Sequence, residues 1–120
     1  MSNPTTPEPQ LPLTPAVFHI LLALADGERH GYSIMQEVAH QSDGQVKMGP
    51  GTLYGTIKRL LHARLIEEAA ERPDPALDDE RRRYYRLTPQ GGLLLQAEIK
   101  RLDAILRQVR ASKLFAGGNV

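Results

Sequence analysis

The residues of this chain best suited to chemistry are hydroxyls and cations gathered between positions 44 and 66, a stretch without a single acidic residue. They include Lys47, Thr52, Tyr54, Thr56, Lys58, Arg59 and Arg64. Side chains of this kind donate hydrogen bonds and neutralise phosphates, which suits the groove of a nucleic acid. A solvated surface helix can have the same composition, so this segment alone leaves both interpretations open.

The spacing within this segment predicts an amphipathic helix from Pro50 to about residue 63. Its apolar residues recur at the i, i+4, i+7 and i+8 positions of one buried stripe, namely Leu53, Ile57, Leu60 and Leu61. We expect the hydroxyls of Thr52 and Thr56 and the charges of Lys58 and Arg59 on the opposite side. The sequence therefore predicts a helix with one face left for a ligand.

Catalytic and metal-binding motifs are missing from the sequence. There is no HExxH motif, and the Gly-Pro-Gly-Thr run at 49–52 lacks the lysine of a phosphate-binding loop. The chain has no cysteine and its four histidines are scattered, which argues against a metal site. We therefore expect a protein that is not an enzyme and has no catalytic residue, cofactor or metal.

The composition of the chain fits one small domain of 120 residues. Its net charge of +1 is nearly neutral, so only the distribution of charge can argue for a nucleic-acid partner. No apolar run reaches the length of a membrane span. Residues 1–10 carry neither the basic nor the apolar part of a secretory signal. We expect a cytoplasmic protein without a membrane partner.

The predicted elements follow one another as three helices, a hairpin and a long helix. Their expected ranges are 15–25, 31–41, 50–63, 65–71 paired with 82–87, and 88–113. Thr14-Pro15 and Thr88-Pro89 are helix starts, and His30 can cap the second helix. The prediction is a mainly α fold with a small β-hairpin: a winged helix-turn-helix at 14–87 and a C-terminal dimerisation helix at 88–113. A Pro-rich arm at 1–13 and a tail at 114–120 are expected to be disordered.

The last helix carries a seam typical of a coiled coil. Its apolar residues step by 4, 3, 4 and 3: Leu95, Ile99, Leu102, Leu106 and Val109. This seam can fold back on the first helix or pair with a second copy. The first helix is itself apolar on most sides, and its apolar residues include Phe18, Leu21 and Leu22. Such a helix must be covered on two faces, by its own domain and by something else. Both features predict a homodimer, with two reading helices about 34 Å apart and a palindromic binding site.

Four short motifs in series resemble the PadR-like transcriptional regulators. They are His30-Gly31-Tyr32-Ser33-Ile34, Gly51-Thr52-Leu53-Tyr54, Leu60 with Leu65-Ile66, and Arg82-Arg83-Tyr84-Tyr85-Arg86-Leu87-Thr88-Pro89-Gln90-Gly91. The resemblance covers roughly residues 14–110. The single short C-terminal helix is similar to that of the smaller subfamily.

The resemblance implies a repressor that binds double-stranded DNA as a homodimer and that a small-molecule effector can release. It implies DNA contacts around the start of the third helix, at Lys47, Gly51, Thr52, Tyr54, Thr56, Lys58 and Arg59. Gly51 leaves room for a sugar–phosphate backbone, and the first N–H groups of the helix attract a phosphate. On the wing, Arg82 and Arg83 either contact DNA or pair with the acids at 78–80. The alternative function is a winged-helix module that binds a protein and no DNA.

Two positions depart from the family pattern. Gly55 stands where the family commonly has proline after the Leu-Tyr pair, and Gly within a helix costs up to about 1 kcal/mol relative to Ala. Arg64 stands where the family usually has glycine before the wing. We therefore expect Arg64 to adopt a positive φ with mild strain, or the turn to differ.

Overall fold

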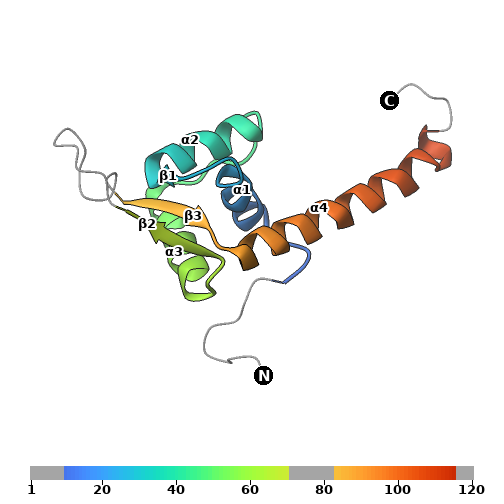
Figure 1. Ribbon diagram of the computed structural model, residues 1–120. Coiled ribbons are helices and arrows are strands. Elements are labelled where there is room, and N and C mark those ends of the chain that lie inside the picture. The colour runs from blue at the N-terminus through green and yellow to red at the C-terminus, as the bar shows by residue number, and fades with distance from the viewer. Residues whose placement is uncertain (1–9, 71–82, 116–120) are drawn as a thin grey trace.

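The computed structural model describes residues 10–70 and 83–115 of the chain. Its elements in chain order are α1 (Pro15–Ala23), β1 (Arg29–His30), α2 (Gly31–Gln41), α3 (Pro50–His62), β2 (Ile66–Ala69), β3 (Tyr84–Leu87), α4 (Pro89–Arg110) and the 3₁₀ turn η1 (Lys113–Phe115). Helices α1 to α3 and the sheet form one body, and α4 runs out of it (Figure 1). The predicted fold class is confirmed: the protein is mainly helical with a small antiparallel sheet.

Helix starts are set by side-chain caps at the predicted positions. The side chains of Thr14, His30 and Thr88 accept hydrogen bonds from the backbone N–H groups of Val17, Ser33 and Gly91. These bonds satisfy donors that the first turn of a helix otherwise leaves without a partner. Helix α3 is the exception, because its N-cap residue is Gly49 and no side chain caps it.

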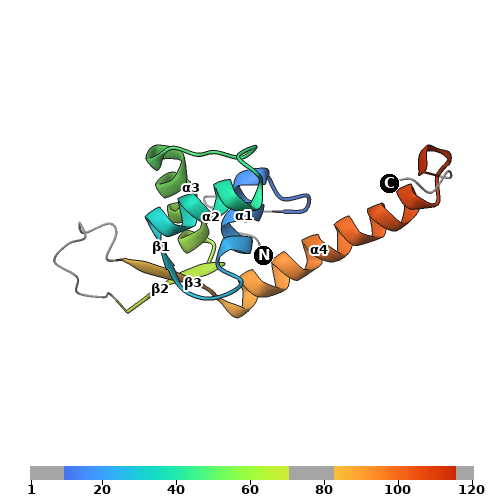
Figure 2. The same cartoon turned by 90° about the horizontal axis from the view of Figure 1, so that it is seen from above.

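The sheet contains one strand more than the predicted hairpin. Strand order is β1-β3-β2, with Arg29 opposite Tyr85 and Ile66 opposite Leu87. The extra strand, β1, has only two residues, too few to give a period. Figure 2 shows α1, α2 and α3 on one side of this sheet. The predicted wing tip at 72–80 lies outside the described residues.

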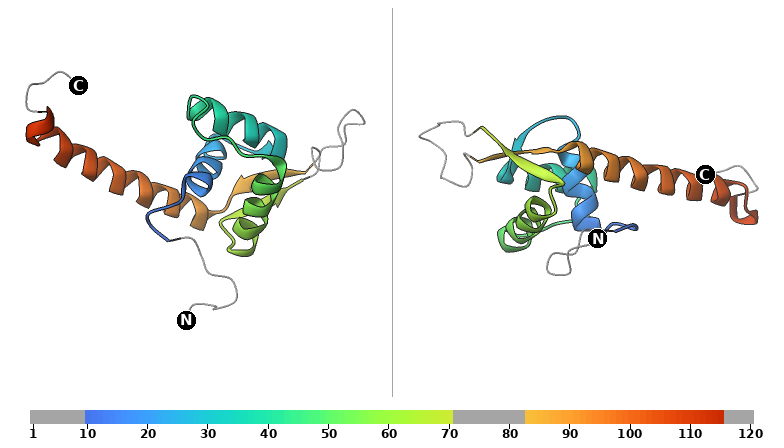
Figure 3. Two further views of the ribbon diagram at one scale, coloured as in Figure 1. Left: turned by 180° about the vertical axis from the view of Figure 1, so that it is seen from behind. Right: turned by 60° about the horizontal axis from the view of Figure 1, so that its bottom comes forward.

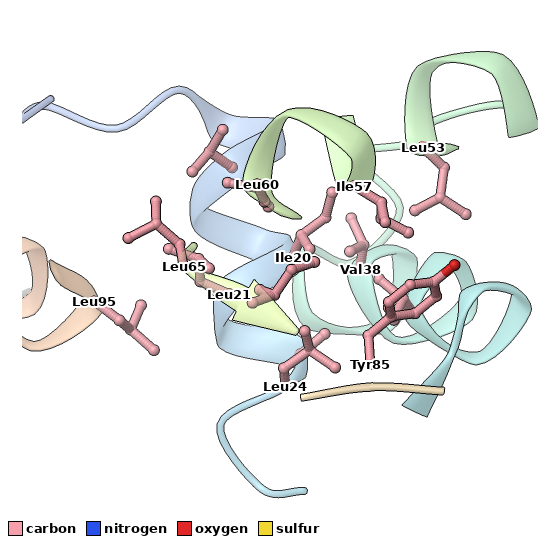
Figure 4. Packing of buried hydrophobic residues seen from close by; sticks show 14 of the residues in the cluster. Ile20, Leu21, Leu24, Val38, Leu53, Ile57, Leu60, Leu65, Tyr85 and Leu95 are labelled. Atoms are coloured by element: carbon pink, nitrogen blue, oxygen red, sulfur yellow. The ribbon is translucent and has the colours of Figure 1, made fainter. Parts of the chain in front are cut away.

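The core is centred on α1, which packs against α2, α3 and α4. The largest fully buried side chains come from four of the elements: Ile20, Leu21, Ile34, Val38, Leu53, Ile57, Leu60 and Ile66. Three of the four residues predicted as the stripe of α3 are among them, and Leu61 is half-buried. In Figure 4 the α3 residues Ile57 and Leu60 lie close to Ile20 of α1, and Leu53 lies farther from it.

Two residues predicted at a dimer interface lie instead in the core of the single chain. Leu21 is fully buried on α1, and Leu95 is 4% exposed at the start of α4 (Figure 4). The reason is that α1 is apolar on most sides, so periodicity could not tell which face its own domain covers. Leu21 and Leu95 are therefore removed from the candidate interface.

The turn after α3 confirms the expected conformation of Arg64, whose φ is +60°. The N–H of Leu65 donates to the carbonyl of Leu60, and the N–H of Arg64 donates to that of Leu61. This pair of bonds is the Schellman motif, which closes a helix with a left-handed residue. A side chain in that conformation costs about 1–2 kcal/mol, which glycine avoids.

Replacing Arg64 with glycine is therefore expected to stabilise the protein. The relief of strain exceeds the extra entropy that glycine gives the unfolded chain, leaving a gain of about 0.5–1 kcal/mol in the free energy of unfolding. Urea titration followed by circular dichroism measures it. Arg64→Ala is the matched control, because it removes the same side chain but keeps the Cβ. A glycine variant no more stable than the alanine variant would contradict the strain.

The start of α4 is fastened to this turn. Thr88 donates its hydroxyl to the carbonyl of Arg64 at 2.6 Å, and its N–H donates to the carbonyl of Leu65 at 3.1 Å. Gly91 passes so close that a Cβ there would lie 1.9 Å from the Leu65 carbonyl oxygen. Only glycine fits at this crossing, so the Thr-Pro-Gln-Gly run fixes where α4 leaves the wing.

A buried carboxylate ties α4 to the segment before α1. Glu98 is 2% exposed, and its Oε2 accepts the N–H of Leu13 at 2.7 Å. Its Oε1 accepts a hydrogen bond from Nε of Arg101. The bond from Arg101, and then that from Leu13, hold the pKa of the Glu98 carboxyl below its ordinary value of 4.5, against the opposite effect of burial.

Because the pKa of Glu98 is lower in the folded than in the unfolded chain, its ionised form stabilises the fold above pH 4.5. This contribution disappears as the pH falls through the lower, folded-state pKa. We expect Glu98→Gln to reduce the free energy of unfolding by about 1–2 kcal/mol at neutral pH, since a hydrogen-bonded charge is lost. Urea titrations at several pH values should show that the difference in free energy of unfolding between the wild type and Glu98→Gln narrows as the pH falls below 4.5. A stability difference independent of pH would contradict a stabilising role of the ionised Glu98 carboxylate.

Helices of the described part do not suit a bilayer. None is both long enough and apolar enough to cross one.

Candidate nucleic-acid interface

Helix α3 presents one continuous face to solvent. The exposed residues on it are Gly51, Thr52, Gly55, Lys58, Arg59 and His62. They recur at helical spacing opposite the buried stripe, as the sequence predicted for Thr52, Lys58 and Arg59. In Figures 1 and 3 this helix lies toward the opposite end of the molecule from the free end of α4. The face is therefore clear of the protruding helix.

The N-terminal end of α3 is open. Gly49 caps the helix through its backbone only, and Pro50 occupies the first helical position. A Cβ placed on Gly49, Gly51 or Gly55 would meet nothing within 4 Å. Packing within the chain therefore does not require these glycines, although each exposed helical Gly costs about 1 kcal/mol relative to Ala. The arrangement leaves free space and helix N–H groups at one place on the surface.

Thr56 does not lie on this face, contrary to the sequence prediction. It is 3% exposed, and its hydroxyl donates to the carbonyl of Thr52 at 2.8 Å. A threonine can be buried in this way because its own helix satisfies the hydroxyl. The same Oγ1 accepts a hydrogen bond from Nη2 of Arg59 at 3.5 Å. Thr56 is thus placed to orient Arg59 and not to contact a ligand.

Tyr54 is half-buried at the junction between α2 and α3. Its ring lies against Gly31, where an added Cβ would be 2.5 Å from the tyrosine Oη. The Gly31-Tyr54 contact brings the first turn of α2 against α3. The DNA contact that the resemblance implies for Tyr54 stays a prediction, and the structure shows that its ring packs within the domain.

As on α4 at Lys100 and Arg110, positively charged side chains without an ion pair to a described residue occur on and next to α3. There, Lys47, Lys58 and Arg59 lie in exposed positions and form no ion pair with a described residue. Such charges set up a local positive potential even on a nearly neutral protein.

The stem of the wing differs, because its cations face carboxylates. Arg83 lies 3.9 Å from Glu68, while Arg86 pairs with Glu67 at 2.8 Å and with Glu28 at 3.3 Å. The hydrogen bonds that Arg86 donates to Glu67 and then to Glu28 raise the pKa of Arg86 above its ordinary value. Arg82 lies outside the described residues. Among the described residues, Arg83 thus pairs with a strand residue, Glu68, and the predicted partners at 78–80 lie outside the described part.

A second exposed surface is apolar. On α4, Ile99, Leu102, Ile105 and Leu106 are 37–49% exposed, and Val109 is half-buried. On α1, Phe18 and Leu22 are half-buried. Large exposed apolar residues in helical register are typical of surfaces that pack against another protein. Except for Ile105, which was not predicted, these are the members of the predicted interface set that remain accessible.

The described residues also form a shallow cavity of about 460 Å³ between the end of α3, β2 and the start of α4. Its lining mixes apolar and charged side chains: Leu61, Arg64, Ile66, Glu67, Glu68, Thr88, Pro89 and Gln90. Its glutamates belong to the wing, and Glu67 and Glu68 already pair with arginines. Nowhere in residues 10–70 and 83–115 do three potential metal ligands come together.

Glu98 is the residue of structural consequence that the sequence reading missed. An available signal was its place three residues after Leu95 and four before Leu102, which puts an acid beside the apolar seam. Arg101, at i+3, supplies the partner that lets the carboxylate be buried.

Comparison with known proteins identifies the family. Residues 20–97 match the model of the "Transcriptional regulator PadR-like family". An uncharacterised 37.1 kDa protein in transposon Tn4556 of Streptomyces fradiae is 40% identical over 79 residues, which cover 66% of this chain but 20% of that protein. The chain thus aligns with a fifth of that relative's length. Uncharacterised protein X of Lysinibacillus sphaericus is 32% identical over 81 residues, 68% of this chain and 72% of that protein.

Solved structures share the fold. A PadR-like transcriptional regulator of Bacillus cereus (BC4206) superposes with a TM-score of 0.63 at 20% identity, covering 78% of this chain and 86% of that one. Bacillus subtilis PadR, solved with operator DNA, superposes with a TM-score of 0.59 at 22% identity, covering 69% of this chain and 45% of that one. Bordetella bronchiseptica BpsR, whose DNA binding is regulated by 6-hydroxynicotinic acid, superposes with a TM-score of 0.61 at 26% identity, covering 85% of this chain and 64% of that one.

Proposed function

The chain belongs to the PadR-like family of transcriptional regulators, and from this premise we propose that it is a repressor that binds a palindromic DNA operator as a homodimer. Family membership also places it among regulators and not among enzymes. The observation that carries the proposal is the exposed face of α3, where unpaired cations, open glycines and free helix N–H groups occur together.

The proposed contacts divide this face by chemistry. Close to the N-terminal end, Gly51 and Thr52 receive a phosphate, because the helix dipole and free N–H groups favour an anion there. Lys47 and Lys58 neutralise flanking phosphates. Arg59, oriented by Thr56, reads a guanine in the major groove or clamps a phosphate.

The other predicted contacts are secondary in this proposal. Tyr54 supports the site by holding α2 against α3. The wing contributes less than α3 along its stem, because Arg83 and Arg86 face carboxylates of their own chain. The contribution of Arg82 depends on residues outside the described part.

A homodimer accounts for the apolar surface of α4. Pairing of two copies through Ile99, Leu102, Leu106 and Val109, with Phe18 and Leu22 of α1 at its edge, would cover side chains that one chain leaves exposed. A two-fold axis through this pair would present two α3 helices to successive major grooves, about 34 Å apart. Such symmetry requires a palindromic operator.

We further propose that a small molecule releases the operator, as 6-hydroxynicotinic acid regulates DNA binding in the related BpsR.

Selection from a random duplex pool tests the proposed function. The purified full chain, immobilised through a terminal tag, is incubated with the pool, and bound DNA is amplified and sequenced over several rounds. We expect enrichment of one palindrome whose half-sites lie about one helical turn, or roughly 10 base pairs, apart. A folded dimer that enriches no sequence at low salt would contradict DNA regulation and favour the protein-interaction module. Enrichment of a single asymmetric site would contradict the dimeric mode.

A further inference from the structure

Glu98 marks the point where α4 leaves the body of the molecule. The buried residues of α4 are Gly91, Leu95 and Glu98, and none follows Glu98 in the helix. Beyond it the helix continues from Ile99 to Arg110, roughly 18 Å at a rise of about 1.5 Å per residue. Figures 1 and 3 show this part extending away from the other elements. Glu98 is thus the last buried residue of α4 before the helix protrudes from the body of the molecule.

Glu98 joins elements that are distant in sequence. One carboxylate oxygen of Glu98 accepts the N–H of Leu13, 85 residues earlier, at 2.7 Å. Leu13 is buried, and the next residue, Thr14, caps α1. The other oxygen accepts from Arg101 on the next turn of α4. The Arg101 bond holds the Glu98 side chain in place on α4, and the Leu13 bond ties that carboxylate, and with it the rotation of α4 about its own axis, to the start of α1.

Hydrophobic packing around this point is less directional. Leu95 is the one apolar side chain of α4 that is buried in the chain, and apolar contacts tolerate small rotations that a two-sided hydrogen-bonded carboxylate does not. A rotation at Glu98 would be carried along the protruding helix to its apolar residues. In the proposed dimer that helix holds the partner, so the angle at Glu98 sets where the second α3 lies.

We propose that Glu98 is a positioning residue that fixes the angle between α4 and the DNA-binding body, and thereby the half-site spacing that the dimer accepts. The inference rests on the proposed function, because spacing has meaning only for a dimer on a two-part operator. Glu98 itself touches no DNA. Its effect is on the choice between operators and not on the affinity of one α3 for one half-site.

The first test measures geometry without DNA. The chain has no cysteine, so Gln36→Cys on the exposed side of α2 gives one spin label per subunit, and double electron–electron resonance reports the distance between the two bodies of the dimer. We expect a single narrow distribution with Glu98, and a broadened or shifted one with Glu98→Gln and with Arg101→Gln. Asp103→Asn is the matched control, because it breaks the exposed Asp103–Arg107 pair on the same helix and should leave the distribution unchanged.

The second test measures spacing selectivity by fluorescence anisotropy on the selected palindrome and on versions with one base pair inserted or removed between half-sites. One base pair displaces a half-site by about 3.4 Å and rotates it by about 34°. We therefore expect the wild type to bind the altered operators at least about tenfold more weakly than the selected palindrome. The Glu98→Gln dimer should bind the altered operators at most about threefold more weakly than the selected palindrome. Its affinity for an isolated half-site should equal that of the wild type. Both variants must sediment as folded dimers, and Arg101→Gln provides a second route if Glu98→Gln unfolds.

The two failures are distinguishable. A wild type that selects no palindrome contradicts the proposed function itself. A wild type that selects one, with variants that keep both the narrow distance distribution and the same spacing preference, overturns the role of Glu98 alone.

Discussion

Replacing Lys58 and Arg59 together with alanine is expected to weaken binding to the selected operator about a hundredfold or more. The proposed dimer carries two copies of α3, so up to four charge-assisted contacts are lost, each contributing about 1 kcal/mol or more. The dependence of log affinity on log salt should also flatten by about 0.9 per lost phosphate contact. Fluorescence anisotropy over a salt series measures both quantities.

The controls separate this effect from unfolding and from general charge. Both side chains are exposed and unpaired in the described structure, so the free energy of unfolding should change by about 0.5 kcal/mol or less. Lys100→Ala removes an exposed cation from α4 and should leave both affinity and salt slope near those of the wild type. Unchanged binding by the double variant would mean that another face reads the DNA.

Replacing Leu102 and Leu106 together with glutamate is expected to convert the dimer to monomers. Four leucines leave the paired seam, and four charges enter it. At a minimum of about 1 kcal/mol per leucine the dimer is weakened by about 4 kcal/mol, or roughly a thousandfold. Analytical ultracentrifugation over a concentration series measures the change, and circular dichroism should show that the helical body remains folded.

Leu93→Glu is the matched control for this surface. Leu93 is 66% exposed on α4, and helical geometry places it on the side opposite Leu102 and Leu106. The same leucine-to-glutamate change there should leave the dimer intact. Monomers from Leu93→Glu, or dimers from the double variant, would move the interface to another face.

Local signals in the sequence predicted local structure well. The Thr-Pro pairs at 14 and 88 begin helices because a hydroxyl caps and a proline needs no partner for its missing N–H. A hairpin strand at 82–87 was also predicted, and β3 lies within that range, with Tyr85 buried and Arg86 exposed. The positive φ of Arg64 followed from the position of glycine in related turns.

Features that depend on distant partners were not predictable from one sequence. Thr56 was assigned to the polar face, and only the Thr52 carbonyl explains its burial. Glu98 was overlooked because a carboxylate is buried only when donors meet it, and one of its donors is 85 residues away. For the same reason, Leu21 and Leu95 could not be separated from the accessible residues of an apolar helix.

The division of charge also came from the fold. The sequence places three arginines side by side at 81–83, which suggests a cationic wing. Strand register instead sets Arg86 opposite Glu67, and Arg83 comes within reach of Glu68. The unpaired cations of the described residues near the site are then those of α3 and Lys47. This contrast between paired wing arginines and α3 cations favours α3 as the reading element.

The most direct test of the role of α3 is a residue-resolved titration of the full chain with DNA. Uniformly ¹⁵N-labelled protein is titrated with the selected duplex and, separately, with a scrambled duplex, and amide shifts are followed by heteronuclear NMR. We expect the selected duplex to shift the amides of Gly51, Thr52 and Lys58 strongly, with little change at Leu93 and Lys100. Shifts confined to α4 or the wing, with α3 unmoved, would contradict the proposal that this face of α3 reads the operator.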